Sequence, residues 1–332
     1  MSPSYSSSPL APLLYAGIDV AKATLALDYA GHTLTVPNSA AGHAALIQRF
    51  DQTGPTQVVV EATGGYEQSL VAALHAHQIL VSVIQPRRIR AFAEGQGWLA
   101  KTDALDAAVL RQFGEQVHPA PMPVVTPAQQ ELAAWVQRRR DLVEMQTMEQ
   151  NRLEHYAGTA AAQAVAQHLK SLKLLIGAAE AEIARLIAQD PVQRARAARL
   201  QELKGVGPII AATLLAEMPE LGTLSDTAAA ALAGVAPYNQ DSGPHKGRRT
   251  IRGGRLAVRC GLYLAAWTAS RYDPIFQATY QRLLKNGKAK LVALVAVMRK
   301  LIVLANHLLK HADFKLQHGS NVRLTPAPST PH

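Results

Sequence analysis

Four acidic side chains in the first third of the chain have the spacing of a metal site. Asp19 ends a short apolar run, and Glu61 follows the β-branched run 57–60. Asp103 and Asp106 lie three residues apart, so a helix places both on one face. Carboxylate oxygens suit Mg²⁺ or Mn²⁺, and a metal pair about 4 Å apart can hold the attacking and leaving oxygens of a phosphodiester. These acids predict metal-dependent phosphodiester chemistry.

Convergence of these acids requires cations. Two carboxylates about 4 Å apart repel by roughly 4 kcal/mol at an effective dielectric near 20. Each acid also has a simpler interpretation. Asp103 can favour a helix N-terminus capped by Thr102, and Asp19 can be a turn residue or begin a phosphate loop of an actin-like kinase fold. Glu61 is the hardest to explain otherwise, because the run 57–60 directs it toward the core.

A serine in the second half of the chain has a setting that fits a nucleophile. Residues 234–243 read Gly-Val-Ala-Pro-Tyr-Asn-Gln-Asp-Ser-Gly, and Ser242 is followed by a run of cations. A serine hydroxyl needs a base or a metal for activation. Asp241 and His245 are near in sequence, but a metal held by the distant acids answers the need better. A surface loop before a nucleic-acid-binding helix has the same appearance.

The cations favour contact with phosphates. No acid lies between Pro244 and Ala266, whereas a solvated surface normally mixes both signs. A second group of cations follows Pro86, and the glycine-paired turn at 203–208 resembles a helix-hairpin-helix, whose free N–H groups can meet a phosphate. The predicted nucleic-acid-binding residues are Arg87, Arg88, Arg90, Lys101, Gly205, Gly207, Lys246, Arg248, Arg249, Arg252, Arg255 and Arg259.

The composition predicts a soluble protein that binds a polyanion. The 332 residues carry 34 Lys and Arg against 24 Asp and Glu, a formal charge of +10 with a pI near 9.8. Such a balance favours nucleic acid. Cys260 is the single cysteine, which excludes an internal disulfide, fits a reducing cytoplasm and predicts a small core residue. Arg299 and Lys300 interrupt the apolar run 291–309, which argues against a membrane span.

The pattern of residues 13–117 predicts an α/β domain. Apolar runs at 13–20, 24–29 and 32–36 read as an antiparallel meander, followed by a helix at 40–50, a strand at 57–60, a helix at 66–77, a strand at 80–84 and further helix after Pro86. The order βββαβαβα is that of the ribonuclease H-like fold. In that fold the first and fourth strands end side by side and the last helix crosses them.

The rest of the chain is predicted to be helical. A disordered arm covers residues 1–12, a Pro-rich linker 118–127 and a disordered tail 317–332. Helices at 128–156 and 161–189 have narrow apolar faces and predict a helical hairpin or coiled coil within 128–200, often an oligomer interface, or else an ordinary bundle. The predicted seam includes Met145 and Leu175. An all-α C-terminal domain is expected over 201–316, with helices at 225–232, 256–270, 274–284 and 288–310.

Three motifs of the first domain and two of the second resemble one family. The sequences Gly-Ile-Asp-Val-Ala-Lys, Glu-Ala-Thr-Gly-Gly-Tyr-Glu and Ala-Lys-Thr-Asp-Ala-Leu-Asp-Ala are similar to the Asp-Glu-Asp-Asp domain of insertion-sequence recombinases related to the Piv DNA invertase. That domain is RuvC-like. The segments 205–207 and 234–243 resemble the C-terminal transposase domain of the same recombinases, the insertion sequence one-ten family.

This resemblance implies specific roles. Asp19, Glu61, Asp103 and Asp106 would form the metal-binding tetrad, and Ser242 would attack a DNA phosphodiester and form a phosphoserine link. The family resembled uses a structured noncoding bridge RNA to join donor and target DNA. Its members are multimers, in which the acidic domain of one subunit meets the serine of another. The resemblance implies a bacterial cytoplasmic enzyme associated with the nucleoid.

Two other functions stay open from the sequence. In a RuvC-like nuclease, metal-bound water would attack the phosphodiester and Ser242 would only bind phosphate. In a non-catalytic nucleic-acid-binding protein, the acidic site would have decayed. A sugar-kinase-like ATPase is a more remote reading, because a second glycine-rich phosphate loop is lacking in the sequence.

Overall fold

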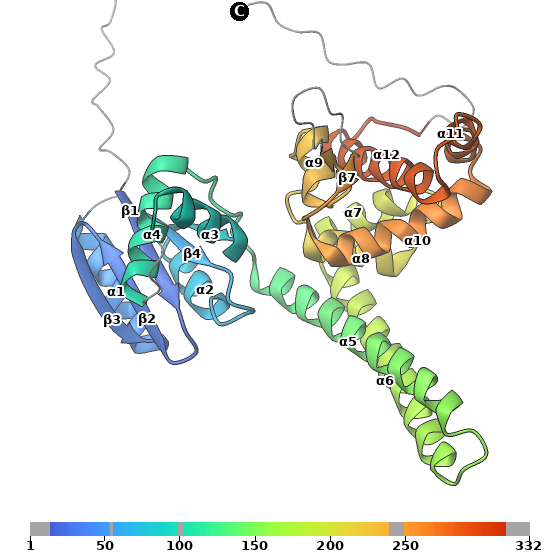
Figure 1. The fold of residues 1–332 in the computed structure, drawn as a ribbon, viewed down its shortest axis with the longest axis horizontal. Coiled ribbons are helices and arrows are strands. Elements are labelled where there is room, and N and C mark those ends of the chain that lie inside the picture. The colour runs from blue at the N-terminus through green and yellow to red at the C-terminus, as the bar shows by residue number, and fades with distance from the viewer. Residues whose placement is uncertain (1–13, 54–55, 99–102, 239–248, 317–332) are drawn as a thin grey trace, which may run out of the picture. The chain divides into compact units, whose positions relative to one another are not determined.

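The computed structural model describes residues 14–53, 56–98, 103–238 and 249–316 (Figure 1). It divides into two compact units, Met1–Val124 and Val125–His332, and each is described by itself. The division falls within the Pro-rich stretch that the sequence analysis interprets as a linker.

The first unit is built on a five-stranded mixed sheet. The strands are β1 (Leu14–Val20), β2 (Thr24–Tyr29), β3 (His32–Pro37), β4 (Thr56–Glu61) and β5 (Leu80–Ile84), in the spatial order β3-β2-β1-β4-β5. The first three are antiparallel and joined by short turns, while β4 and β5 run parallel to β1. Positive φ angles at Ala30 (50°) and Gly31 (78°) fit the two-residue turn between β2 and β3. The predicted meander is confirmed.

Helices cover both faces of this sheet. They are α1 (Ala40–Thr53), α2 (Gln68–Ala76), α3 (Pro86–Gly95) and α4 (Asp103–Val117). Because side chains alternate along a strand, the two faces have separate cores. Ile18 and Val58 belong to the core that includes residues of α1 and α2, whereas Tyr15 and Val59 belong to the core with α3 and α4. The sequence predicted one helix after β5, and the described chain has two.

Helix α4 packs closely on β1 because β1 has a glycine at the contact. A Cβ at Gly17 would lie 2.0 Å from the carbonyl oxygen of Ala107 and 2.4 Å from the nitrogen of Arg111. A Cβ at Gly114 would lie 2.5 Å from the ring of Tyr15. Residue numbers therefore rise from 15 to 17 along β1 where they fall from 114 to 107 along the facing part of α4. The helix runs antiparallel to the strand.

The second unit is mainly helical. Helices α5 (Pro127–His155) and α6 (Ala161–Gln189) form a long hairpin, at the bounds expected within one residue. The helices that follow are α7 (Pro191–Gln201), α8 (Pro208–Glu217), α9 (Asp226–Leu232), α10 (Leu256–Tyr272), α11 (Pro274–Lys285) and α12 (Lys290–Lys310). Thr126 caps α5 with a reciprocal capping box through Gln129, which fixes where the hairpin begins.

The seam of the hairpin is narrower than predicted. Leu142 of α5 packs with Leu172 and Ala179 of α6 in a small cluster of its own. Met145 and Leu175 were expected in this seam, but they are exposed, because the helical repeat carries them off the contact face. The expected seam is wrong at these two positions.

Helix α12 is the centre of the C-terminal core. Its length and mean hydropathy of 1.8 are enough to cross a membrane. Core helices of soluble proteins meet the same test, and here 61% of the apolar window is buried by the protein itself. Val297, Leu301 and Leu304 lie in the largest hydrophobic cluster, together with residues of α8 and α10. This packing agrees with the interpretation of 291–309 as a buried helix.

Two predictions for this unit are wrong. It was expected to be all-α, but Pro237–Tyr238 (β6) and Thr250–Ile251 (β7) form a short antiparallel ribbon. Two-residue strands have too short a pattern to be read from sequence. Cys260 was expected in the core, yet it is exposed, since α10 directs its neighbours Val258 and Leu262 inward instead.

Candidate active site

The ends of β1 and β4 bring two of the predicted acids together. The two strands are parallel, and Ile18 is the register partner of Val60. Asp19 and Glu61 are the next residues on each strand, so they occupy neighbouring positions at the carboxyl edge of the sheet. Both are half-buried. Because Gly17 and Val59 face α4, the alternation of strand side chains puts Asp19 and Glu61 on that same face.

The other two acids come from the first turn of α4. This helix begins at Asp103, and Asp106 lies on its first turn and is half-buried. Since α4 runs antiparallel to β1 with Ala107 over Gly17, its first turn lies toward the end of β1 that carries Asp19. The step from Gly17 to Asp19 along the strand and the step from Ala107 back to Asp103 along the helix are each about 6 Å long. The helix start and the strand end are therefore at the same edge of the sheet.

The donor set at this edge is chemically suited to a hard divalent cation. Its members Asp19, Glu61 and Asp106 offer only carboxylate oxygens, which Mg²⁺ and Mn²⁺ prefer. Among the side chains that the structure describes, no three acids, histidines or cysteines are close enough to form a complete metal site, and the side chain of Asp103 lies outside that set. The backbone places the acids at one edge; the assembled metal site is a prediction.

The loop after Glu61 is held by a carboxylate of its own. One oxygen of Glu67 accepts hydrogen bonds from the backbone N–H of Thr63 (3.2 Å), the Thr63 hydroxyl (2.8 Å) and the N–H of Gly65 (2.9 Å). Burial acts to raise the pKa of Glu67, but these hydrogen bonds and one from its own backbone outweigh it, so the pKa is lowered. An ionised Glu67 therefore orders the loop that leads out of β4.

An asparagine joins the loops that follow β1 and β4. The Asn38 amide donates to the carbonyl of Ala21 (3.0 Å), just beyond β1, and to the carbonyl of Tyr66 (3.2 Å), in the loop after β4. Its Oδ1 lies 2.9 Å from Nε2 of His43, a buried residue whose pKa burial lowers. Asn38 and Glu67 thus fix the backbone around the acidic edge. Neither residue has a role that its sequence pattern predicts, although Glu67 ends the motif 61–67.

Three exposed arginines lie on the helix that follows β5, the strand next to β4. Glu61 is the register partner of Ile84 on β5, and α3 begins two residues later at Pro86. Arg87, Arg88 and Arg90 are on this helix and are exposed. The guanidinium of Arg88 lies 5.4 Å from the ring centroid of Phe113 on α4. Phe113 lies seven residues beyond Asp106, about 10 Å along α4, so the Arg88 guanidinium is directed away from the acids. Phosphate contact by Arg87 and Arg90 stays a prediction.

The segment that contains Ser242 lies outside the described residues, as do Lys101, Lys246 and Arg248. The residues on either side of the segment are described. Tyr238 pairs with Thr250 across the β6–β7 ribbon, so the described residues on either side of segment 239–248 lie side by side. Arg252 lies over the ring of Tyr238, at 5.3 Å from its centroid. The chain on both sides of the predicted nucleophile is therefore anchored to the same ribbon.

The described arginines of the basic run differ in their partners. Arg249 and Arg252 are exposed. Arg255 forms a paired contact with both carboxylate oxygens of Glu220 (2.5 and 2.9 Å), which lowers the pKa of that carboxyl against the effect of burial. Arg259 donates to the carbonyl of Gly253 at 2.6 Å. Arg255 and Arg259 thus have structural contacts, and Arg249 and Arg252 are the better exposed cations.

The glycine-paired turn joins α7 to α8, as predicted, but its first glycine serves packing. Gly205 has a φ of +93°, and a Cβ there would lie 2.3 Å from the carbonyl oxygen of Ala265 on α10. Gly207 is the exposed N-cap of α8, with open space around it. Of the two glycines, Gly207 is the one placed to offer N–H groups to a ligand.

Comparison with known proteins identifies the family of both parts of the chain. A family model described as "Transposase" matches residues 16–157, which include the acidic edge. A second model, described as "Transposase IS116/IS110/IS902 family", matches residues 197–281, which include the ribbon and α10. The two matches follow the order of the two units, and they define the protein as a transposase. The chain belongs to the IS110 family.

Two relatives match nearly the whole chain. The pilin gene-inverting protein of Moraxella bovis is 28% identical over 308 residues, which cover 88% of this chain and 94% of that protein. The protein with the same description from Moraxella lacunata gives the same identity and coverage. An insertion element IS110 uncharacterized 43.6 kDa protein of Streptomyces coelicolor is 31% identical over 140 residues, 41% of this chain and 33% of that protein.

Proposed function

We propose that this transposase is a DNA recombinase of an insertion sequence, which cuts and rejoins DNA strands through Ser242. The observation that carries the proposal is the acidic edge of the first unit. There Asp19 and Glu61 occupy neighbouring strand ends, and α4 begins with Asp103 and Asp106 at the same edge. The proposal is also supported by both family matches and by similarity over 88% of the chain to a protein described as pilin gene-inverting.

The four carboxylates are proposed to hold Mg²⁺ or Mn²⁺. When bound, such an ion neutralises charge on the phosphate and makes a hydroxyl oxygen more nucleophilic. The protein's part is to fix the ligands. Gly17 lets α4 lie against β1, and Glu67 and Asn38 order the loops after the two strands. Arg87 and Arg90 of α3 are proposed to hold the DNA phosphates beside the acids.

Ser242 is proposed to act as the nucleophile. Its Oγ forms a bond to the phosphorus, and the bond between the phosphorus and the oxygen of the departing strand breaks. The serine proton goes to a base, and the departing oxygen takes up a proton and becomes a hydroxyl. A hydroxyl of another strand then attacks the phosphoserine and releases Ser242. Since the number of phosphodiester bonds is conserved, rejoining needs no external energy source.

Donor and target DNA are the proposed partners, together with a structured noncoding guide RNA. The net charge of +10 supports polyanion binding. The guide RNA rests on the family resemblance. A homo-oligomer, dimer or tetramer, is proposed through the α5–α6 hairpin, where Met148 and Leu174 are 50% and 76% exposed. Exposed apolar side chains on both helices of a long hairpin favour contact with another subunit.

A covalent trapping experiment tests the nucleophile. The full chain with its guide RNA, Mg²⁺ and a labelled donor junction is denatured, and protein-linked DNA is measured. We expect a link with the native chain and at least about a thousandfold less with Ser242→Ala, because the attacking atom is removed. Ser171→Ala, at an exposed serine of α6, is the matched control and should behave like the native chain.

Two results would contradict parts of the proposal. Strand cleavage that persists in Ser242→Ala without a protein link would identify a hydrolase in which water attacks. Recombination that persists in Asp19→Asn and Glu61→Gln would exclude catalysis by metal at the acidic edge. Glu94→Gln, at an exposed carboxylate of α3, is the control for those two variants.

A further inference from the structure

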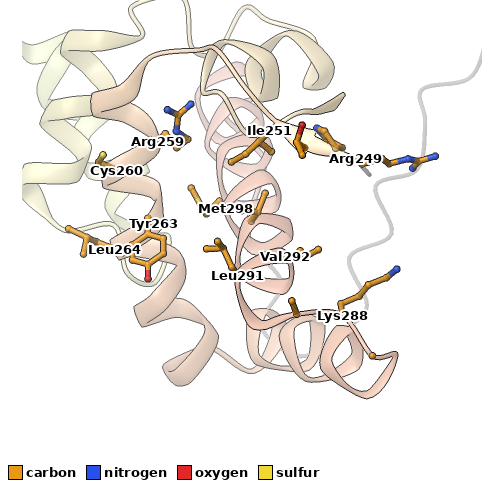
Figure 2. A pocket seen from close by; sticks show the side chains of 15 residues that line it. Arg249, Ile251, Arg259, Cys260, Tyr263, Leu264, Lys288, Leu291, Val292 and Met298 are labelled. Carbon is orange, nitrogen blue, oxygen red and sulfur yellow. The ribbon is translucent and has the colours of Figure 1, made fainter. Parts of the chain in front are cut away.

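Two adjoining cavities open along α10 and α12 of the second unit. The larger, of about 1150 Å³, lies between α10, α12 and the β7 strand (Figure 2). The smaller, of about 560 Å³, is bounded by α10, α11 and α12. Tyr263 and Leu291 line both cavities, so the two form one continuous groove. Its combined size exceeds the about 300–1,000 Å³ of a typical small-molecule pocket, which favours an extended ligand.

Aromatic rings line this groove in a row with a cation. Tyr263, Trp267 and Arg271 are four residues apart on α10 and therefore share one face. The rings of Tyr263 and Trp267 are stacked, with centroids 6.5 Å apart and planes 21° apart. The guanidinium of Arg271 lies 4.1 Å from the Trp267 centroid. Tyr263 is 40% exposed and Trp267 44%, so part of each ring is accessible to solvent.

The charge around the groove has one sign. Arg249, Arg259 and Lys288 line the larger cavity, and Arg271 and Lys290 line the smaller. No Asp or Glu is among the lining residues that the structure describes. Between residues 246 and 310 the sequence has 14 Lys and Arg but a single acid, Asp273, which is buried and caps α11. An apolar floor with exclusively cationic edges is complementary to a ligand with flat rings and negative charge.

Unpaired nucleotides have this chemistry. Their bases stack on aromatic rings and guanidinium planes, and their phosphates meet cations. A second copy of this chain is disfavoured as the ligand, because symmetric pairing of two grooves would place Arg249, Arg259 and Arg271 of one copy against the cations of the other. A double helix is also disfavoured, because its bases are already stacked and offer no free ring surface to Trp267.

We propose that the α10–α12 groove binds unpaired nucleotides of the DNA strand next to the phosphate that Ser242 attacks, with bases stacked on Tyr263 and Trp267. DNA is chosen because Pro237, Arg249 and the β7 strand line the larger cavity and directly flank segment 239–248. The choice of DNA rests on the proposed function. The stacking surface itself rests on the rings and charges of the groove.

Binding of a labelled 15-nucleotide single strand to the full chain tests the proposal. We expect Trp267→Ala and Tyr263→Ala each to weaken binding by about 5- to 100-fold, the effect of losing one stacked base. Trp267→Phe should recover much of the affinity, because it keeps a ring. Tyr272→Ala is the matched control, since Tyr272 is 68% exposed on α10 but lines neither cavity, and it should bind like the native chain.

Several results would overturn the proposal. One is unchanged single-strand affinity in Trp267→Ala and Tyr263→Ala. Another is an equal loss of affinity for duplex DNA of the same sequence, and a third is a loss for RNA of that sequence with none for DNA. A change of oligomeric state in Trp267→Ala, measured by light scattering with DNA affinity unaltered, would instead identify the groove as a subunit interface. Circular dichroism and thermal unfolding of each variant establish that the chain is folded like the native one.

The groove and the proposed recombinase can fail separately. A native chain that binds single strands through Trp267 but never forms protein-linked DNA keeps the groove and loses the serine mechanism. A Trp267→Ala variant that binds single strands normally while Ser242 still forms the link keeps the mechanism and loses the groove.

Discussion

At the scale of single residues, Glu67 holds the loop that follows the acidic edge. Its carboxylate accepts three hydrogen bonds from Thr63 and Gly65, and so it fixes the chain just beyond Glu61. Because its pKa is lowered in the folded protein, ionised Glu67 stabilises the loop above the unfolded pKa of about 4.3. That stability is lost as the pH falls through the lower, folded pKa.

We expect Glu67→Gln to loosen this loop at pH 7 and to have little effect at low pH. A hydrogen-bonded charge is worth about 1.5–3 kcal/mol, but Glu67 is half-buried and solvent screens it, so a loss of about 1 kcal/mol is expected. Hydrogen exchange of a peptide covering residues 61–67 should be about fivefold faster at pH 7, after correction for intrinsic rates. The difference should shrink below pH 4. An equal difference at both values would show that the charge is not responsible; Glu94→Gln is the control.

At the scale of elements, the contact of α4 with β1 depends on Gly17. We expect Gly17→Ala to destabilise the first unit by about 1–3 kcal/mol, because its Cβ would overlap backbone atoms of Ala107 and Arg111 that cannot rotate away. The helix must move outward and take Asp106 with it. DNA cleavage should therefore fall more than stability alone explains, when both are measured at a temperature where the variant is folded.

The matched control for Gly17 is another glycine of the same unit. Gly95 is the last residue of α3, and a Cβ there would meet nothing within 4 Å. Gly95→Ala should leave cleavage unchanged and stability equal or slightly higher, since alanine lowers the entropy of the unfolded chain. If Gly17→Ala is as harmless as Gly95→Ala in denaturant unfolding and cleavage, close packing of α4 does not position the acids.

The elements with a clear repeat were predictable from the sequence. The strands of the meander and the α5–α6 hairpin follow from hydrophobic period and capping residues, whereas the division of the helical stretch after Pro86 into α3 and α4 was not predicted. The contacts between these elements were not predictable from the sequence. That Gly17 faces α4, or that Gly205 fits against Ala265, depends on contacts between residues 60 to 90 positions apart in sequence, which no local pattern encodes.

The short features failed for a related physical reason. The β6–β7 ribbon has two residues on each strand, too few for a recognisable pattern, and its strands are 12 residues apart in sequence. Cys260 lies between buried residues in sequence, and only the rotation of α10 shows that it faces outward. Of the candidate site, sequence placed the acids on the right elements, but Glu67 and Asn38 act through backbone contacts that the sequence does not reveal.

At the scale of the whole molecule, the proposed chemistry is divided between two units. The acids belong to Met1–Val124, and Ser242 belongs to Val125–His332. Each unit has its own hydrophobic cores, and the proposed site takes its acids from one unit and its serine from the other. In an oligomer, the acids of one subunit can serve either its own serine or that of a partner.

Mixing two inactive variants decides between these arrangements. We expect Asp19→Asn and Ser242→Ala, co-assembled in equal amounts, to regain covalent DNA attachment, because a mixed dimer has one site with native acids and a native serine from different subunits. Random assembly into dimers makes about a quarter of all sites native. If each site is built within one subunit, every site in the mixture keeps one defect, and attachment stays at the level of the separate variants.

The variant that carries both substitutions in one chain is the internal control, because sharing of sites between subunits lowers the fraction of native sites in its mixture instead of raising it. Mixed in equal amounts with the native chain, Asp19→Asn/Ser242→Ala leaves about half of the sites native if each is built within one subunit. If sites are shared, both sites of a mixed dimer are defective, and only about a quarter remain native in the native homodimers. Sharing thus requires recovery in the first mixture together with excess loss in the second. Recovery without that excess loss would indicate subunit-independent sites rescued by another route, and the shared site would be wrong.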